Sequence, residues 1–301
     1  MKKVIIAIIV IALVGFGFYY VINNSSNNVT KVNDQNVAST TVDTNATSTK
    51  PINKAETVIG KSVENRDITA YHYGTGTTTE ILFVGGIHGG YEWNTVSLSY
   101  SLMDYLKANP SAIPANLKVT VIPVLNPDGL NKTVGTAERF SLSDVPTPES
   151  KTISGRFNAN DVDLNRNFNC DWQANAKWQS KTVSGGSAVF SEPESLAVKN
   201  YIETQKPEAV VVYYSAAGGV FSSSCHNGIL PETNALTNAY AKASGYPAFE
   251  KFDFYATTGD MVNWLAKINV PAISVLLTNH NDVEWNKNLA GVKAIIKYYT
   301  K

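Results

Sequence analysis

The residues best suited to catalysis in this chain are a histidine and a glutamate that follow an apolar run. Residues 81–84 are the end of that run, which is typical of a buried strand. The chain then passes through Gly85 and Gly86 to His88 and Glu92. Imidazole nitrogen and carboxylate oxygen are ordinary zinc ligands, and glycines let the backbone approach an ion closely. The pattern indicates a zinc site at a strand end, although a strand-turn-helix with an incidental histidine would give the same pattern.

A second group of side chains suits an anionic ligand. Asn165 and Arg166 are adjacent, and Arg156 lies shortly upstream. A planar guanidinium beside an amide matches the geometry of a carboxylate, and a second arginine would polarise a carbonyl or hold an oxyanion. Tyr255 lies in a glycine-containing loop before a predicted helix. Charged surface loops and packed loop tyrosines share these local patterns.

Strand and helix patterns alternate around these residues. Strands are expected over 68–73, 80–84, 117–125, 209–214 and 272–277, and helices over 94–108, 233–244, 259–267 and 288–300. A turn is expected at 126–129, and a capping box with an early proline at 191–194 should start a helix that ends near residue 205. The alternation predicts an α/β domain with a parallel or mixed central sheet.

The N-terminal part of the chain differs in composition. Two lysines precede an apolar run over residues 4–22, which is long enough to cross a bilayer and favours a cytoplasmic N-terminus. A cleaved signal peptide is the alternative, but no small-x-small site follows the run. Residues 23–55 are polar and lack apolar periodicity, as in a flexible stalk. We therefore expect a transmembrane signal-anchor over 1–22 and a folded domain over 56–301 on the extracytoplasmic side of the membrane.

The charge balance argues against nucleic-acid binding, and the two cysteines favour a disulfide. The chain has 25 basic and 25 acidic side chains, so no bulk charge draws it to nucleic acid. Its two cysteines, Cys170 and Cys225, both lie in the exported part. An oxidising compartment favours a disulfide between them, with two buried free thiols as the alternative.

Taken together, these residues resemble the zinc metallocarboxypeptidase family of the carboxypeptidase A type, as a divergent bacterial-type member. The likeness covers essentially the whole folded domain and follows the family's order through 85–88, 126–129, 163–167 and the Tyr255 loop. The resemblance implies a three-layer α/β/α sandwich on a mixed sheet, with zinc at the strand ends.

The resemblance also implies roles for the opening residues. His88 and Glu92 would be zinc ligands, and Arg156 would polarise the scissile carbonyl. The family has two residues between its histidine and glutamate, whereas this chain has the three residues 89–91. One extra residue in a glycine turn can be absorbed, so Glu92 remains the expected ligand.

The second group of residues, around Asn165 and Arg166, would recognise the substrate. By the same resemblance, Asn165 and Arg166 would bind the terminal carboxylate of a peptide, and Tyr255 would close over the bound residue.

Two positions depart from the family pattern. Tyr214 occupies the position of the third zinc ligand, a histidine in the family, and Leu276 occupies that of the general base, a glutamate. Leucine cannot move a proton, and loss of positioned acid–base help costs roughly 10²- to 10⁴-fold in rate. Catalytic zinc normally has three protein ligands plus water, so the metal should also be weakened.

Other residues offer substitutes for the two lost groups. We hypothesise that His226, which a Cys170–Cys225 bridge would hold near the Asn165 segment, completes the metal site. The loop over 280–284 contains His280 and two carboxylates and could supply a base, although a surface cluster has the same composition. Tyr214 could itself offer an oxygen to the metal.

Three functions follow from these alternatives. An exported metallocarboxypeptidase would use zinc to polarise a carbonyl and activate water at the free C-terminus of peptides, including cell-wall (peptidoglycan) stem peptides. A catalytically inactive relative would bind peptide ends or cell wall through the same residues. A serine hydrolase built on Ser215 lacks the Gly-x-Ser-x-Gly elbow.

Overall fold

The computed structural model describes residues 55–300. The predicted signal-anchor over 1–22 and all but the last residue of the predicted stalk lie outside this range. Among the residues described, no helix has both the length and the apolarity that crossing a membrane requires.

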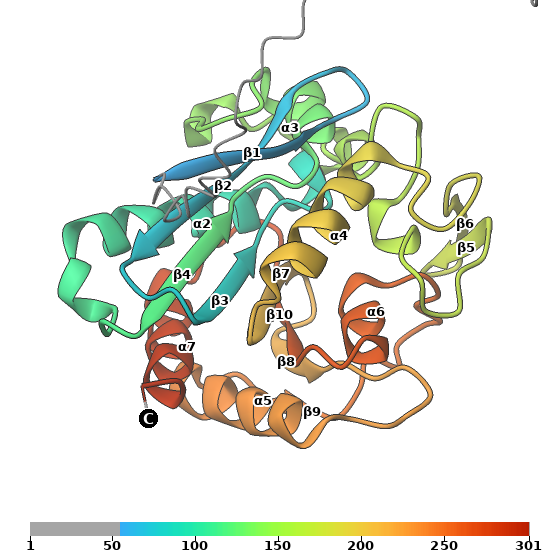
Figure 1. Cartoon of the computed structure of the whole chain (residues 1–301). Helices are drawn as coiled ribbons and strands as arrows, with labels where there is room; N and C mark the ends of the chain where they lie inside the picture. Colours follow the sequence, from blue (N-terminus) through green and yellow to red (C-terminus); the bar gives the residue numbers. More distant parts are fainter. Residues whose placement is uncertain (1–54, 301) are drawn as a thin grey trace, which may run out of the picture. The chain divides into compact units, whose positions relative to one another are not determined.

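A mixed sheet of eight strands forms the centre of the domain (Figure 1), in the order β1-β2-β4-β3-β7-β10-β8-β9. Strands β4, β3, β7 and β10 run parallel to one another, whereas β2 and β8 are antiparallel to their neighbours β4 and β10. The strands are β1 (Glu56–Lys61), β2 (Asp67–Gly74), β3 (Thr79–Val84), β4 (Leu117–Ile122), β7 (Ala209–Ser215), β8 (Gly219–Ser222), β9 (Ala248–Phe249) and β10 (Ala272–Leu277).

Helices cover both faces of this sheet. They are α2 (Trp93–Ala108), α3 (Pro127–Val134), α4 (Pro193–Gln205), α5 (Pro231–Ser244), α6 (Met261–Lys267) and α7 (Trp285–Tyr298). A separate hairpin joins β5 (Asn175–Trp178) to β6 (Lys181–Ser184).

Alternating side chains of the central strands form two cores. In β7, Val211 and Tyr213 pack with α2, α5 and α7, whereas Val210, Val212 and Tyr214 pack with α4 and α6. Period-two alternation places successive side chains on opposite faces. The helices therefore lie in two layers around the sheet (Figure 1), which confirms the predicted three-layer α/β/α architecture.

Some predicted boundaries differ from the structure. β4 ends at Ile122 because Pro123 has no N–H to donate to the ladder. The expected turn at 126–129 is instead the start of α3, where the Asn126 side chain accepts a hydrogen bond from the Gly129 N–H. Helix α4 begins as expected, but its N-cap is Glu192 and has no side-chain cap, so the capping-box prediction was wrong.

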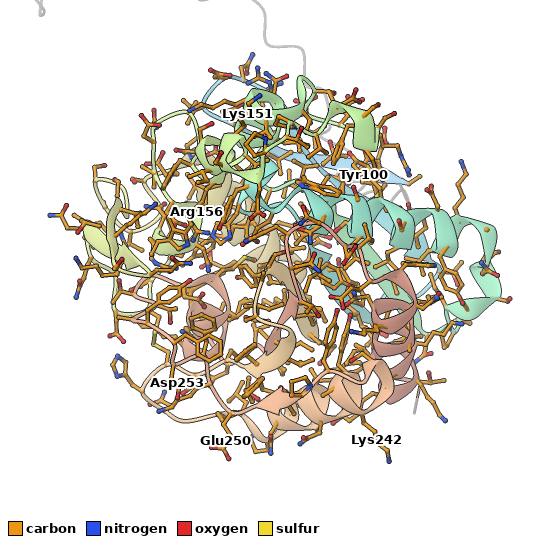
Figure 2. All side chains as sticks on the ribbon, turned by 180° about the vertical axis from the view of Figure 1, so that it is seen from behind. Tyr100, Lys151, Arg156, Lys242, Glu250 and Asp253 are labelled. Atoms are coloured by element: carbon orange, nitrogen blue, oxygen red, sulfur yellow. A yellow bond between two sulfur atoms is a disulfide. The ribbon has the colours of Figure 1, made fainter. Side chains whose placement is uncertain are left out.

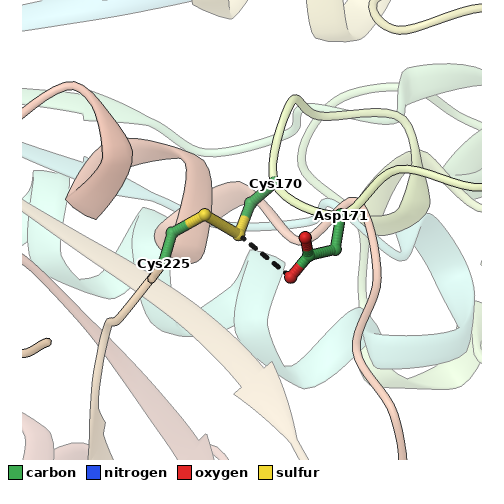
Figure 3. A group of neighbouring side chains, drawn as sticks. All are labelled: Cys170, Asp171 and Cys225. Atoms are coloured by element: carbon green, nitrogen blue, oxygen red, sulfur yellow. Dashed lines mark hydrogen bonds between the residues drawn. A yellow bond between two sulfur atoms is a disulfide. The ribbon is translucent and has the colours of Figure 1, made fainter. Parts of the chain in front are cut away.

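The predicted disulfide is present. Cys170 and Cys225, separated by 55 positions, are bonded to each other (Figure 3). The Asp171 carboxylate lies 3.9 Å from the Cys170 sulfur. Because both sulfurs are consumed by the bond, neither is a thiolate that would ligate a metal beside this carboxylate.

Candidate functional site

The predicted site residues surround one cavity. It has a volume of about 950 Å³ and lies where β7 and β10 approach their carboxyl ends and where the chain leaves β3. Its lining includes all eight cavity positions singled out from the sequence, namely His88, Glu92, Arg156, Asn165, Arg166, Tyr214, Tyr255 and Leu276. The structure therefore brings the two groups together in a shared hollow.

His88 and Glu92 lie close together in the lining of this cavity. The extra residue between them is accommodated by a single 3-10 turn over Gly89–Glu92, in which Gly89 adopts a φ of +46°. His88 Nδ1 lies 2.9 Å from Glu92 Oε1, and both side chains are buried. Neither His88 nitrogen nor Glu92 Oε2 has a hydrogen-bond partner among the residues described. A buried imidazole and a buried carboxylate this close together, with polar atoms that lack hydrogen-bond partners, fit two ligands of one cation.

A carboxylate that the sequence analysis gave no role supports this pair. Asp163 is fully buried, and its Oδ1 lies 3.3 Å from His88 Nε2. A carboxylate behind the second nitrogen is a common way to orient a ligating histidine. Burial acts to raise the pKa of Asp163, but the Arg156 charge, with help from Arg166 and His88, holds that pKa well below its usual value. Asp163 is therefore an anion at neutral pH.

Arg156 lines the cavity and is held in place by several contacts. Its Nε and Nη2 donate to Asp163 Oδ2 over 2.9 and 2.8 Å. The guanidinium carbon lies 4.5 Å from the centre of the Trp178 ring. Figure 2 shows Arg156 within the body of the molecule and Lys151 nearer its edge. An arginine fixed in this way is a preorganised donor for a carbonyl or oxyanion.

Asn165, Arg166 and Tyr255 form what we call the carboxylate clamp. Arg166 Nε donates to the Lys177 carbonyl over 2.8 Å, and Nη1 donates to the Asn165 carbonyl over 2.6 Å. The guanidinium carbon lies 5.9 Å from the centre of the Tyr255 ring. Burial raises the pKa of Tyr255, so this phenol keeps its proton at neutral pH.

The Asn165 amide is fixed at both ends. Its Oδ1 accepts from the Met261 N–H over 3.0 Å and from the Tyr214 hydroxyl over 3.3 Å. Its Nδ2 donates to Asp260 Oδ2 over 2.8 Å. Since Nδ2 carries two hydrogens, one N–H remains for a ligand.

The two departures from the family pattern both face this cavity. Leu276 is paired with Tyr214 across the parallel β10 and β7 strands, and both side chains line the hollow. The Tyr214 ring lies 5.8 Å from the His88 ring. Burial raises the pKa of Tyr214 well above its usual value, with Asp260 and Glu92 adding to the effect. The Tyr214 hydroxyl donates to Asn165, and Leu276 has no group that can take up a proton, so neither position offers the histidine ligand or the carboxylate base of the family pattern.

The histidines considered as substitutes lie in different places. His226 is exposed, and its Nε2 lies 2.7 Å from Asp171 Oδ1, so it does not line the cavity. Contrary to our hypothesis, the Cys170–Cys225 bridge does not bring its side chain to the metal position. His280 does line the cavity, and its Nδ1 is buried without a hydrogen-bond partner. Burial lowers the pKa of His280, so its imidazole is neutral near pH 7.

Comparison with known proteins agrees with this site and fold. The zinc carboxypeptidase family model matches residues 43–280. Carboxypeptidase O from Homo sapiens is 30% identical over 172 residues, which cover 52% of this chain and 44% of that protein. Murein peptide amidase A from Vibrio campbellii is 26% identical over 254 residues, covering 80% of this chain and 87% of that protein. The chain thus spans less than half the length of the first relative and most of the second.

A solved structure shows the same architecture. Carboxypeptidase A from Helicoverpa armigera superposes with a TM-score of 0.63 at 18% sequence identity, covering 82% of this chain and 69% of that one. This likeness concerns the fold alone. The family match extends over most of the 301 residues, and on that basis the chain belongs to the zinc carboxypeptidase family.

Proposed function

We propose that this domain binds the free C-terminal carboxylate of peptides in the cavity. The proposal rests on the buried charge of Arg166, which has no carboxylate partner among the residues described. Its guanidinium is buried and held by two backbone carbonyls, yet no carboxylate lies within ion-pairing distance of it among residues 55–300. A buried guanidinium with free donors is matched by a ligand carboxylate, which it would bind through paired hydrogen bonds.

The rest of the clamp supports the same ligand. Asn165 has one N–H left for a carboxylate oxygen, and the Tyr255 phenol lies over the Arg166 charge. Arg156 would hold the carbonyl of the last peptide bond, as its fixed position allows.

Peptidoglycan stem peptides are the ligand class that we propose. The murein peptide amidase from Vibrio campbellii aligns along 80% of this chain. The apolar run over residues 4–22 would anchor the chain and place the domain on the extracytoplasmic side of the membrane, where cell-wall peptides expose free C-termini.

We propose that turnover at this site is strongly reduced, so that binding is the main activity. By the family resemblance Leu276 occupies the position of the base and Tyr214 that of the third zinc ligand, and the Tyr214 hydroxyl donates to Asn165. Absence of the base alone slows hydrolysis by roughly 10²- to 10⁴-fold.

Residual peptide hydrolysis is the second candidate function, and one observation favours it. His88 Nδ1 lies 2.9 Å from Glu92 Oε1, both side chains are buried, and Glu92 Oε2 has no hydrogen-bond partner among the residues described. They would hold a zinc ion as two of its ligands. When bound, zinc supplies polarisation of a carbonyl and activation of water.

Calorimetry on the purified full chain tests the proposal. Two peptides that differ only in a free or amidated C-terminus are titrated before and after treatment with a chelator. We expect the free acid to bind at least ten-fold more tightly than the amide, with no loss after chelation. Equal affinities would overturn the proposal.

Metal content and release of the C-terminal residue are measured on the same samples. Stoichiometric zinc together with rapid, chelator-sensitive release would show that hydrolysis is the main activity. Slow or absent release beside chelator-resistant binding supports the binding function.

A further inference from the structure

One exposed dipeptide beside the cavity has reactive groups that the fold does not hold in place. Asn227 and Gly228 are both exposed and lie outside the helices and strands, in the loop between β8 and α5. The dipeptide Asn-Gly occurs once in the 301 residues of the chain. Glycine has no Cβ, so nothing on Gly228 shields its backbone nitrogen from the side chain of the preceding asparagine.

Both reacting groups of this dipeptide are free of hydrogen bonds. Among residues 55–300, neither the Asn227 side-chain amide nor the Gly228 N–H has a hydrogen-bond partner. The Asn227 backbone N–H does donate to the Cys225 carbonyl, over 2.7 Å, which leaves the side chain free to turn. A methyl group built on Gly228 would meet no atom within 4 Å. The Gly228 nitrogen and the Asn227 side-chain carbonyl carbon therefore approach each other without breaking a contact.

A second dipeptide with the same potential chemistry is locked by the fold. Asp128 and Gly129 would form the same ring with loss of water, but Asp128 is only 3% exposed. The Gly129 N–H donates to Asn126 Oδ1 over 2.8 Å in the first turn of α3. The Asp128 carboxylate accepts hydrogen bonds from three donors, namely Ser62 Oγ, the Glu64 N–H and Arg66 Nη1. The structure thus leaves one of the two dipeptides free to react.

We propose that Asn227 is a site of spontaneous covalent modification, at which the chain converts a side-chain amide into a carboxylate. The Gly228 nitrogen attacks the Asn227 side-chain carbonyl carbon, a C–N bond forms, and ammonia leaves with the proton of the Gly228 N–H. Water then opens the resulting succinimide ring at either of its two carbonyls. One opening gives aspartate, and the other gives isoaspartate, in which the main chain runs through the former side chain.

Isoaspartate at this position lengthens the main chain by one carbon beside the cavity. Ser224 and Ile229, on either side of the dipeptide, both line the cavity. Cys225 is bonded to Cys170 (Figure 3), so the chain before Asn227 is covalently fixed. The added length therefore displaces the chain after Asn227, which contains Ile229. The new negative charge also disfavours a ligand carboxylate in the same cavity.

Mass spectrometry of the purified full chain tests the modification. The protein is incubated in mildly alkaline buffer, which favours attack by the amide nitrogen, and the fragment that contains residue 227 is analysed over time. Asn227 should convert to a mixture of aspartate and isoaspartate, while the exposed Asn238, which precedes Ala239 in α5, should stay an amide. Equal conversion of Asn227 and Asn238 would overturn the proposal.

Two further measurements tie this result to the structure. In an Asn227→Gln variant the amide is retained but the ring that must close is larger, so the conversion should disappear. In guanidinium chloride the locked Asp128 should begin to form isoaspartate, whereas the rate at Asn227 should change little, because the folded chain already leaves it free. If unfolding accelerated Asn227 as strongly as Asp128, the folded structure would not present a free site, and the proposal would fail.

Calorimetry on fresh and aged protein tests the effect on the cavity, and this arm alone rests on the proposed function. The free-acid peptide should bind roughly 2- to 10-fold more weakly to aged protein, and equally well to fresh and aged Asn227→Gln. Unchanged affinity in a fully converted sample would overturn the link between the dipeptide and the cavity. A fresh chain that binds acid and amide alike would overturn the proposed function and leave the modification of Asn227 standing.

Discussion

The two walls of the cavity differ in how completely their polar groups are paired. On the clamp wall, Asn165 and Arg166 are fixed by hydrogen bonds to backbone groups and to Asp260. On what we call the metal wall, formed by His88 and Glu92, both imidazole nitrogens and Glu92 Oε2 are buried without a hydrogen-bond partner among residues 55–300. Binding a carboxylate needs only fixed donors and a charge, and these are intact. Moving a proton needs a titratable group at a defined place, and the Leu276 position does not provide one.

A single carboxylate joins the two walls. Asp163 Oδ2 accepts both bonds from Arg156, and its Oδ1 lies 3.3 Å from His88 Nε2. The same Oδ1 accepts the Asn165 N–H over 3.1 Å. The geometry of the clamp and of the metal pair therefore depends on one buried anion.

The largest effect should come from restoring the two residues of the family pattern that this chain lacks at positions 214 and 276. In a Tyr214→His, Leu276→Glu double variant, the third ligand and the base of the family pattern are both present. Release of the C-terminal residue from a peptide should rise by roughly 10²- to 10⁴-fold, because proton transfer regains a positioned carboxylate. The measurement is the rate of free amino acid release, with and without chelator.

The matched control for this gain is a Tyr214→His, Leu276→Gln variant, which has the same ligand set and no base. It should hold zinc as firmly as the double variant but show little of the added rate. If the glutamate and glutamine variants were equally active, or equally inactive, the contrast between the walls would not explain the loss of turnover.

Removing the shared anion should have the next largest effect. Asp163→Asn removes the carboxylate that accepts both hydrogen bonds of the buried Arg156 and leaves it only Glu92, 3.9 Å away, which costs about 3–5 kcal/mol of unfolding free energy. The pKa of Asp163 is lowered on folding, so its contribution is present above the unfolded pKa of about 3.9 and declines as the pH falls below it. Urea unfolding at pH 7 and pH 3 should show a large difference between the two proteins at pH 7 and a smaller one at pH 3.

Two outcomes of that experiment would contradict the role of Asp163. One is a variant as stable as the original at pH 7, and the other is a difference that grows as the pH falls. Asp104→Asn is the control, because Asp104 also pairs with an arginine, Arg139, but at the surface. Exposed pairs contribute about 0–1 kcal/mol, so this substitution should change the free energy of unfolding very little.

A conservative change on the clamp wall should have a smaller effect. Arg166→Lys keeps the positive charge but loses the planar fork, so the free-acid peptide should bind about ten-fold more weakly while the amide is unaffected. Calorimetry with the acid and amide peptides gives both numbers, and Arg139→Lys at the surface is the control. A variant that binds the acid as well as the original chain would remove Arg166 from the clamp.

Much of this site followed from residue types and order alone. His88 and Glu92 were found because they follow the end of a strand, and Asn165 and Arg166 because an arginine beside an asparagine is a local pattern. The bounds of β10 were also predicted exactly as 272–277, since six consecutive apolar or small residues follow a proline.

The remaining features depend on contacts between distant parts of the chain. Asp260 hydrogen-bonds with Asn165 across a sequence separation of 95, which no local pattern reveals. β9 is only two residues long and exposed, so it lacks the apolar signature of a strand. α3 was taken for a turn because Pro, Asp and Gly after Asn126 suit both a turn and a helix start.

The smallest predicted effect concerns the residue at which the two walls meet. Tyr214 donates to Asn165 on the clamp wall, and its ring lies 5.8 Å from the His88 ring on the other. Tyr214→Phe removes only the hydroxyl, so Asn165 keeps its bond from the Met261 N–H but loses one constraint. A net cost of about 0.5–1.5 kcal/mol corresponds to roughly 2- to 10-fold weaker binding of the free-acid peptide.

The zinc affinity of Tyr214→Phe sharpens the comparison further. Burial raises the pKa of Tyr214 well above its usual value, and its hydroxyl already donates to Asn165, so we expect that it does not serve as a metal ligand. Titration of the purified variant with zinc should therefore give the same affinity as the original chain, while peptide affinity falls. If zinc affinity fell and peptide affinity did not, Tyr214 would be a metal ligand that acts together with His88 and Glu92. The two titrations on one variant thus decide to which wall this residue belongs.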